Sequence, residues 1–485
     1  MPSRQDQLHS YQYAQQRVVA ALVTHDPDPH RSPLRRAGTT VLVSIVVAAL
    51  ALGGAAAYGL LKGRSSVDPR DESVVFLEKG TGARYVYLKS DDKMHPVLNY
   101  TSGLLIANAQ APQMKNASPE SLAAVPLGDP MGIPDAPDTL PPAKGGLLKS
   151  LWTVCSQVPQ GGSDADDAES VLTIGEAVSG GTVLPVPRAD TPPDQLRGLL
   201  VTDRAGRTFL VYNNKRFLIP AARVQQTRTF FRWNQAALPV ATAWINAVPI
   251  GPDLKPPLIA DFGSRSAAVA NFQVGQVLRI HSDGSTADQW GVVLSDGVAD
   301  LTEVQANLMQ ADPDAYTAQQ ITPTLYGNLP RSKTQPVAAA TAAGLPPAVP
   351  VLLNGPDSVC LTYDGGANGE ISVRIGPQPP AGNAVRGEDP APGSVQADRI
   401  YVPRGKGAVV VVASSPTAPA SSGTVSIVTD TGRSYPLASR DVLAKLGYGG
   451  VQPQAIPGQL VELLPLGPAL DPERARLANA AQKNR

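Results

Sequence analysis

The sequence predicts an α+β protein that is mainly β. It comprises an N-terminal cytoplasmic helix, one transmembrane helix and a large extracytoplasmic domain of four small ββα-like repeats around a central β core. Three observations lead to this prediction. One long stretch near the N-terminus is apolar and uncharged, short β-type segments recur with Asp/Gly turns, and the 485 residues include 44 glycines and 47 prolines. Glycine and proline together make up about 19% of the chain against a usual figure of about 12%, which indicates many turns and stiff connections.

The transmembrane helix is predicted over residues 39–61, which read TTVLVSIVVAALALGGAAAYGLL and carry no charge. At a rise of about 1.5 Å per residue, this segment spans about 34 Å as a helix, enough for a hydrocarbon core of about 30 Å. A cleaved signal peptide is the alternative. It is disfavoured because a long polar segment precedes the apolar run, whereas the charged region of a signal peptide is short.

The orientation is predicted with the N-terminus in the cytoplasm and the remainder outside. Arg31, Arg35 and Arg36 precede the span, although the basic residues on its two sides differ only slightly in number. Both cysteines, Cys155 and Cys360, follow the span, and a disulfide between them requires an oxidising compartment. Free buried thiols remain the alternative for this pair.

The cytoplasmic segment, residues 1–38, is predicted to contain one helix that ends at Asp26-Pro27, with Asp6 as its N-cap. Its apolar residues recur at roughly helical spacing, and a helix of this size buries little by itself. We therefore expect it to dock on a partner protein or on the membrane surface. The alternative is a loosely ordered tail. The expected docking residues are Leu8, Tyr11, Tyr13, Val18 and Leu22.

Four hairpin-like units recur after the span, each with an apolar strand, an Asp/Gly-type turn and a second strand that carries an aromatic residue. Asp203, Asp283 and Asp430 are interpreted as turn formers rather than catalytic or metal-binding groups. Helical segments are predicted after the last three units, at residues 241–246, 301–309 and 439–447, with Gly447 as the C-cap of the last. The hairpins are expected at residues 76–88, 199–212, 277–294 and 425–437.

A central β domain is predicted from segments that lie between these units. The run Val409–Val412 is a buried strand by composition, and Cys155 and Cys360 lie at or in two of the others. Proline-rich connectors separate the pieces, which favours stiff joints over flexible linkers. The candidate strands are residues 151–154, 170–174, 359–363, 371–375 and 408–413.

The residues provide no recognisable catalytic site, metal site or cofactor site. The chain lacks a phosphate-binding GxxxxGK[ST] loop, a GxSxG turn and an HExxH pair. His95 and His281 are the two histidines expected outside the membrane, and each is interpreted as solvated. The acidic run 164–169 is interpreted as a solvated loop. The segment 404–407 fits a tight turn and an anion site equally well.

The charge balance argues against nucleic-acid binding. Forty-one basic and 41 acidic residues give a net charge of zero, so no long-range attraction to a polyanion is expected.

Several motifs, taken in order, resemble the EccB family, the single-pass membrane component of the type VII (ESX) secretion system. Each motif is weak alone, and the series covers nearly the whole chain. The similar segments are Gln7–Tyr13 with Arg17 and Ala20–Leu22, Tyr85-Val86, His95–Asn99 with Ser102, Pro126–Gly128, Met131–Pro137, Trp152–Cys155, Cys360, Leu446–Tyr448 and Leu463–Pro468 with Leu470. Gly103–Ile106 departs from the family pattern, where an Ala-Arg pair usually precedes Leu-Ile, and the region after Cys360 lacks the common tryptophans.

The resemblance implies a structural, non-enzymatic subunit that scaffolds the export channel and its extracytoplasmic assembly in the plasma membrane. It also implies that Cys155 and Cys360 are the family's disulfide pair. The implied partners are an EccC-like motor ATPase, EccD-like and EccE-like membrane proteins, a mycosin protease and further copies of the extracytoplasmic domain.

The expected boundaries complete the prediction. Residues 62–485 form the extracytoplasmic domain, with repeats at 72–110, 197–250, 272–312 and 423–468 and a core from 143–185 and 350–415. Two other functions remain as alternatives. One is a single-pass protein that binds peptidoglycan, and the other is a weak ATP hydrolase, as labels in the family suggest.

Overall fold

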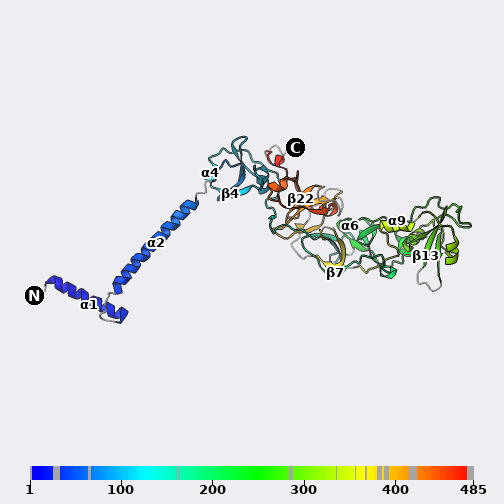
Figure 1. The fold of residues 1–485 in the computed structure, drawn as a ribbon, viewed down its shortest axis with the longest axis horizontal. Coiled ribbons are helices and arrows are strands. Elements are labelled where there is room, and N and C mark those ends of the chain that lie inside the picture. Colours follow the sequence, from blue (N-terminus) through cyan, green and yellow to red (C-terminus); the bar gives the residue numbers. More distant parts are fainter. Residues whose placement is uncertain are drawn as a thin grey trace. The chain divides into compact units, whose positions relative to one another are not determined.

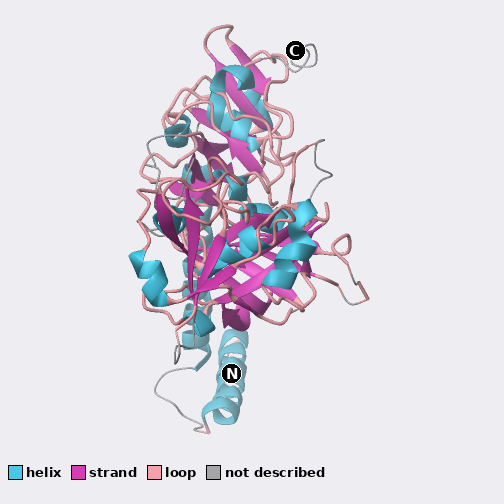
Figure 2. Ribbon diagram, turned by 90° about the vertical axis from the view of Figure 1, so that its right-hand side faces the viewer, coloured by secondary structure: helices cyan, strands magenta, loops and turns pink. Residues whose placement is uncertain are grey.

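The computed structural model describes most of the chain and separates it into two compact units, residues 1–68 and 69–485 (Figure 1). Helices make up the first unit, and strands and loops predominate in the second (Figure 2). The described residues are 3–25, 33–63, 67–159, 161–162, 164–282, 288–334, 336–355, 357–365, 369–379, 385–386, 393–413 and 423–477.

The first unit consists of helix α1 (Arg4–Thr24) and helix α2 (Pro33–Gly63). Gly38–Tyr58 within α2 is long and apolar enough to cross a membrane, by its length and composition. The described part of the chain contains this one candidate span. Because its residues are uncharged, the sequence alone was sufficient to place it within a few residues.

The second unit contains four sheets that share one order of four strands; we call them the four-stranded sheets, although the second also has a fifth strand, β16. In each sheet three consecutive strands form an antiparallel meander, and a fourth strand pairs in parallel with the first. A helix separates the third strand from the fourth. The first sheet, for example, has the order β3-β2-β1-β4, and α3 (Tyr100–Ile106) precedes its last strand.

The bounds of these strands follow, sheet by sheet. The strands are β1 (Val74–Glu78), β2 (Arg84–Leu88), β3 (Lys93–Pro96) and β4 (Gln113–Ala117); β8 (Arg197–Asp203), β9 (Thr208–Tyr212), β10 (Lys215–Ile219) and β11 (Leu238–Val240), with β16 (Val351–Leu352) also on β8; β12 (Val277–Ile280), β13 (Gln289–Leu294), β14 (Gly297–Leu301) and β15 (Gln319–Ile321); and β21 (Ala408–Ala413), β22 (Val425–Val428), β23 (Ser434–Pro436) and β24 (Gln454–Pro457).

Each of these sheets has one helix before its fourth strand and another soon after it. The first set is α3, α5 (Val224–Phe230), α7 (Glu303–Gln310) and α10 (Val442–Lys445). The second set is α4 (Pro119–Leu122), α6 (Thr242–Ala247), α8 (Pro323–Asn328) and α11 (Gly458–Val461). The helix predicted at 241–246 is therefore α6, which belongs to the second set, whereas the sequence pattern missed α5. Gly447 has a φ of 86°, as a left-handed C-cap residue requires.

The predicted boundaries of the four units need correction. Residues 72–110 leave out β4, residues 272–312 leave out β15, and residues 423–468 leave out β21. The strand Ala408–Ala413 was assigned to the central core, but it pairs with β22 and β24 in the fourth sheet. Its run of valines indicates burial and does not specify a sheet, which explains the error. The turn at Asp283 lies outside the described residues.

A proline-containing segment closes the edge of each of these sheets in the same way. One residue of the third strand donates its N–H to a proline carbonyl and accepts an N–H from the residue two positions after that proline. For example, the Arg216 N–H donates to the Pro249 carbonyl at 2.8 Å, and the Arg216 carbonyl accepts the Gly251 N–H at 2.8 Å. The other three sets are Met94 with Pro126 and Gly128, Val298 with Pro330 and Ser332, and Ser434 with Pro465 and Gly467.

The fifth sheet has seven strands and is assembled from distant segments, as predicted for the central core. Its order is β19-β20-β6-β5-β17-β18-β7. The strands are β5 (Trp152–Gln157), β6 (Glu169–Ile174), β7 (Ser179–Val183), β17 (Ser358–Tyr363), β18 (Ile371–Gln378), β19 (Val385–Arg386) and β20 (Arg399–Tyr401).

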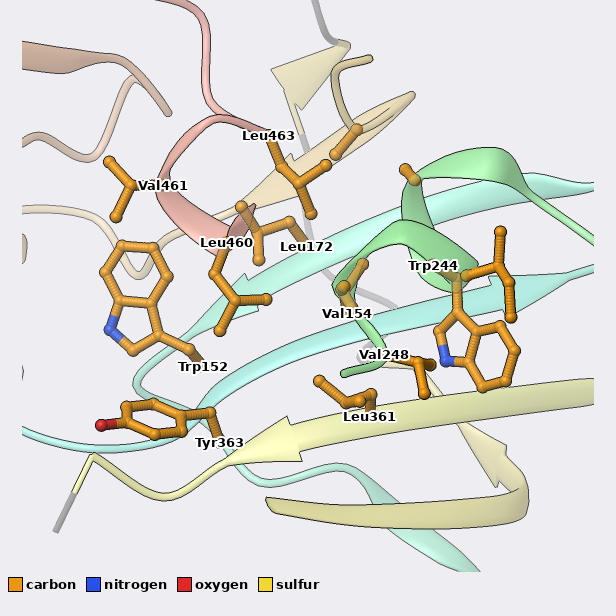
Figure 3. Close-up of a cluster of buried hydrophobic side chains, with 14 of the residues drawn as sticks. Trp152, Val154, Leu172, Trp244, Val248, Leu361, Tyr363, Leu460, Val461 and Leu463 are labelled. Atoms are coloured by element: carbon orange, nitrogen blue, oxygen red, sulfur yellow. The ribbon is translucent and has the colours of Figure 1, made fainter. Parts of the chain in front are cut away.

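The main hydrophobic core lies against this sheet. Trp152 and Tyr363 are buried side by side, Trp244 comes from α6, and Leu460 comes from α11 (Figure 3). Helices that follow the second and fourth four-stranded sheets therefore cover the seven-stranded sheet. This packing joins segments more than 300 residues apart into one core.

Candidate anchoring and docking site

Helix α1 begins with a capping box formed by Ser3 and Asp6. The Asp6 N–H donates to the Ser3 hydroxyl at 3.3 Å, and the Ser3 N–H donates to the Asp6 carboxylate at 3.1 Å. The prediction of Asp6 as the N-cap was therefore wrong by three residues: Ser3 is the N-cap, and Asp6 occupies the third helical position. These bonds lower the pKa of Asp6, with the Ser3 hydroxyl as the main cause.

The five predicted docking residues are all exposed, but they do not share one face of α1. Successive residues of an α-helix are rotated by about 100°, so residues spaced three or four apart lie together. Leu8, Tyr11, Val18 and Leu22 follow this spacing and form one stripe. Tyr13 lies on roughly the opposite side, where the Arg17 guanidinium lies 5.8 Å from its ring centroid. We call these four residues the α1 stripe. They are the predicted docking residues that lie on one face of the helix.

Helix α2 contains the candidate membrane anchor. None of the described residues of its 21-residue apolar segment Gly38–Tyr58 is buried, and its valine, leucine and isoleucine side chains are exposed. An exposed apolar helix of about 31 Å fits a bilayer in length and surface chemistry. The segment can thus anchor the chain in a membrane.

The two cysteines lie directly opposite each other on β5 and β17, in register across an antiparallel pair. They form a disulfide, and their Cα atoms are 3.9 Å apart. Both are fully buried in the middle of the seven-stranded sheet. Next to them Thr153 and Thr362 share a hydrogen bond of 3.0 Å. The cross-link closes a chain segment with a sequence separation of 205 residues, which includes the whole second and third four-stranded sheets.

His95 is buried, so the expectation that it is solvated was wrong. Its Nδ1 lies 2.8 Å from the Asp129 carbonyl oxygen and its Nε2 lies 3.0 Å from the Asp91 carboxylate. The ring packs on Gly128, and these contacts tie the β2–β3 turn to the segment after α4. His281 is partly exposed and lies 2.8 Å from Asp288.

The described aspartates of the predicted turns have structural partners. Asp203 is fully buried, and it accepts the N–H groups of Ala205 and Arg207 at 3.1 and 2.9 Å, which closes the β8–β9 turn. Asp430 accepts the N–H of Gly405 at 2.8 Å. Within the described ranges, no group of three or more His, Cys, Asp or Glu side chains could hold a metal ion.

The contacts between four-stranded sheets could not be read from the sequence. The first and fourth sheets share a core in which Val75, Leu105, Val411 and Tyr448 are buried. Lys445 donates to the Ala107 carbonyl at 2.8 Å across this junction, and burial lowers the pKa of its amine.

The second and third sheets join in a similar way. Phe231 and Leu308 share a core there, and the Arg223 guanidinium lies 2.8 Å from the Asp312 carboxylate. In both junctions the helices that precede the fourth strands contact each other, α3 with α10 and α5 with α7.

Comparison with known families gives a match over almost the whole chain. The model of the family described as "Type VII secretion system ESX-1, transport TM domain B" covers residues 1–482.

Individual relatives are more distant. The chain is 27% identical over 312 residues to the ESX-1 secretion system ATPase EccB1 of Mycobacterium tuberculosis, which covers 63% of this chain and 60% of the relative. It is 27% identical over 508 residues to the ESX-3 secretion system ATPase EccB3 of the same species, covering 98% and 89%. The chain thus spans less than two thirds of the EccB1 relative and most of the EccB3 relative.

Two solved structures share the fold. A chain of an intact ESX-5 inner membrane complex superimposes with a TM-score of 0.62 at 21% identity, covering 99% of this chain and 96% of that chain. A chain of an EccB3 dimer from the ESX-3 core complex gives a TM-score of 0.60 at 24% identity, covering 84% and 100%.

Proposed function

Because the chain belongs to the type VII secretion EccB family, we propose that it is a membrane-anchored structural subunit of an ESX secretion complex, which scaffolds the export channel. The family match over residues 1–482 is the observation that carries this proposal. The apolar segment Gly38–Tyr58, which is the one candidate span among the described residues, and the disulfide between Cys155 and Cys360 are consistent with it.

The proposed topology puts residues 1–38 in the cytoplasm, residues 39–61 in the plasma membrane and residues 62–485 outside. A buried disulfide is stable in an oxidising compartment, which supports an external position for Cys155 and Cys360. Substituted cysteines test this topology. Ser3→Cys should resist a membrane-impermeant maleimide in intact cells, and Ser264→Cys should react. The reverse pattern would invert the topology.

We also propose that the four-stranded sheets are four copies of one module. Their shared strand order, the two helices and the proline-segment bonds support this. A compensating pair adds to the support. The residues Gly128, Gly251 and Gly467 pack on the rings of His95, Phe217 and Tyr435. The corresponding positions of the third sheet are occupied by Ser332 and the small Ala299. A ring on the third strand leaves no space for a β-carbon in the proline segment, so glycine is found there. An alanine on the third strand leaves space for the β-carbon of serine.

For partners we propose an EccC-like motor ATPase, EccD-like and EccE-like membrane proteins, a mycosin protease and other copies of this chain. Two solved structures that share its fold come from an inner membrane complex and from a dimer, which supports assembly as the role. Affinity purification from membranes, with identification of the co-purifying chains, tests the proposal. Recovery of the chain alone from mildly solubilised membranes would contradict it.

We propose that the chain does not hydrolyse ATP, although relatives carry ATPase in their names. The absence of a GxxxxGK[ST] loop from the sequence supports this. The test is a coupled ATP-turnover assay on the purified full chain in detergent. Turnover that increases in proportion to protein and disappears in a point variant would overturn the proposal.

A further inference from the structure

A cleft of about 1210 Å³ lies between the second and third four-stranded sheets. The end of α5, strands β13 and β14 and residues 347–352 contribute to its lining. Phe231 and Trp233 meet edge to face at 4.7 Å in its wall, and the Trp233 indole donates to the Pro350 carbonyl at 3.0 Å. The wall is therefore held in place by packing and hydrogen bonding before any ligand arrives.

Arg232 lines this cleft in a conformation that arginine rarely adopts. Helix α5 ends in a Schellman motif, because the Trp233 N–H bonds the Arg228 carbonyl at 2.9 Å and the Arg232 N–H bonds the Thr229 carbonyl at 3.1 Å. In this motif the residue that follows the C-cap adopts the left-handed conformation. Arg232 occupies this position and has a φ of 55°. Glycine is the usual residue there because a β-carbon makes this conformation unfavourable. Strain of this kind is concentrated at functional positions.

The other charged side chains of the cleft have partners. Arg279 lies 2.6 Å from Asp288, and Arg331 lies 3.1 Å from Asp300. Glu303 accepts the Val349 N–H at 3.3 Å in the first turn of α7. Among the described residues, Arg232 is the cation of this cleft whose side chain makes no hydrogen bond or ion pair, and the residue is exposed.

Apolar rings line the same cleft. Phe230, the residue two positions before Arg232, is 41% exposed, and Trp290 on strand β13 is half-buried. A ligand that suits the cleft therefore combines an anionic group for Arg232 with apolar side chains for the rings. Guanidinium groups bind carboxylates with paired, charge-assisted hydrogen bonds.

We propose that the cleft between the second and third sheets binds an acidic polypeptide segment, with a carboxylate on Arg232 and apolar side chains against Phe230 and Trp290. The size of the cleft and its preformed wall suit a short extended segment better than a single small anion. This inference goes beyond the proposed role in assembly and does not depend on it.

The test uses the full chain in detergent and a fluorescein-labelled heptapeptide of alternating glutamate and leucine. We expect saturable binding by fluorescence anisotropy, and weaker binding of the matching lysine–leucine peptide. Arg232→Gly should weaken binding of the acidic peptide by about tenfold or more, since it removes a charge-assisted pair. The same variant relieves the left-handed strain, so its melting temperature should equal or exceed that of the wild type.

Arg265→Gln is the matched control, because it removes an exposed cation outside the cleft. It should bind the acidic peptide as the wild type does. Equal loss of binding in both variants would mean a general charge effect and would overturn the proposal. Unchanged binding in Arg232→Gly, no binding to the wild type, or preference for the basic peptide would each overturn it as well.

Discussion

The ring of Phe217 on β10 lies directly against the α-carbon of Gly251. A β-carbon on Gly251 would lie 2.5 Å from Cε1 of Phe217, which is closer than real side chains approach. Phe217 is fully buried, so its ring cannot move into solvent. The pair fixes the segment that follows α6 against the edge of the second sheet.

Gly251→Ala should therefore destabilise the second sheet by about 1–3 kcal/mol through overpacking. Thermal unfolding followed by tryptophan fluorescence measures this, because Trp233 is buried in the same hydrophobic cluster as Phe217. Gly327→Ala is the matched control. Its β-carbon would meet nothing within 4 Å, and alanine favours the helix α8, so stability should be unchanged or slightly higher. Equal melting temperatures for Gly251→Ala and the wild type would refute the packing argument.

Removal of the disulfide should cost about 2–5 kcal/mol, since a cross-link over a long loop restricts the unfolded chain. The double variant Cys155→Ala with Cys360→Ala is the change, and denaturant unfolding is the measurement. In a non-reducing denaturing gel, the wild type should migrate faster than the double variant, and reductant should abolish the difference. Identical migration without reductant would show that the bond is absent.

Tyr326 provides a prediction for alkaline pH. Burial, followed by its 2.8 Å hydrogen bond to Asp300, raises its pKa from 10.0 to about 12. The folded state therefore favours the neutral phenol. This contribution to stability is complete below pH 10 and is lost as the pH rises towards 12.

The measurement for Tyr326 is the free energy of unfolding between pH 9 and pH 12. The wild type should lose more stability over this range than Tyr326→Phe, which has no phenol to ionise. Parallel pH profiles for the two proteins would contradict the prediction.

The α1 stripe gives a prediction about assembly. The double variant Leu8→Ser with Leu22→Ser removes two exposed apolar side chains from one helix face, so recovery of partner chains in affinity purification should fall. Tyr13→Ser is the matched control, because Tyr13 lies on the opposite side of α1. If the Tyr13 variant lost partners and the double variant kept them, the docking face would be the other one.

A charge in the middle of α2 should impair membrane anchoring. Ala48→Arg lies near the centre of the span, where an arginine costs about 2.5–3.5 kcal/mol. The fraction of the protein released by alkaline carbonate should rise, whereas Ala48→Leu should remain in the membrane pellet. Full retention of the arginine variant would argue that another part of the chain holds it there.

Local patterns predicted the elements that depend on neighbouring residues. The uncharged run at 39–61 identified α2, and the Asp/Gly turn at Asp203 with its flanking apolar residues identified β8 and β9. The fourth strand of every one of these sheets escaped prediction, as did the third strand of the first three sheets. Strands such as β4 (Gln113–Ala117) and β15 (Gln319–Ile321) are polar and mostly exposed edges, so they show no apolar pattern.

The sequence by itself determined the candidate membrane span, the β-rich character of the second unit and the family, because these depend on composition, short-range periodicity and ordered motifs. The tertiary structure decided which distant strands share a sheet. It placed Val409–Val412 with β22 rather than with the cysteine strands, buried His95 against Gly128, and brought Arg232 to the cleft beside the third sheet. The physical reason is twofold. An apolar run indicates that a strand is buried but does not indicate which strand pairs with it. The backbone N–H and C=O groups of a strand can bond to any other strand, so the packing of side chains from the whole chain selects the partner.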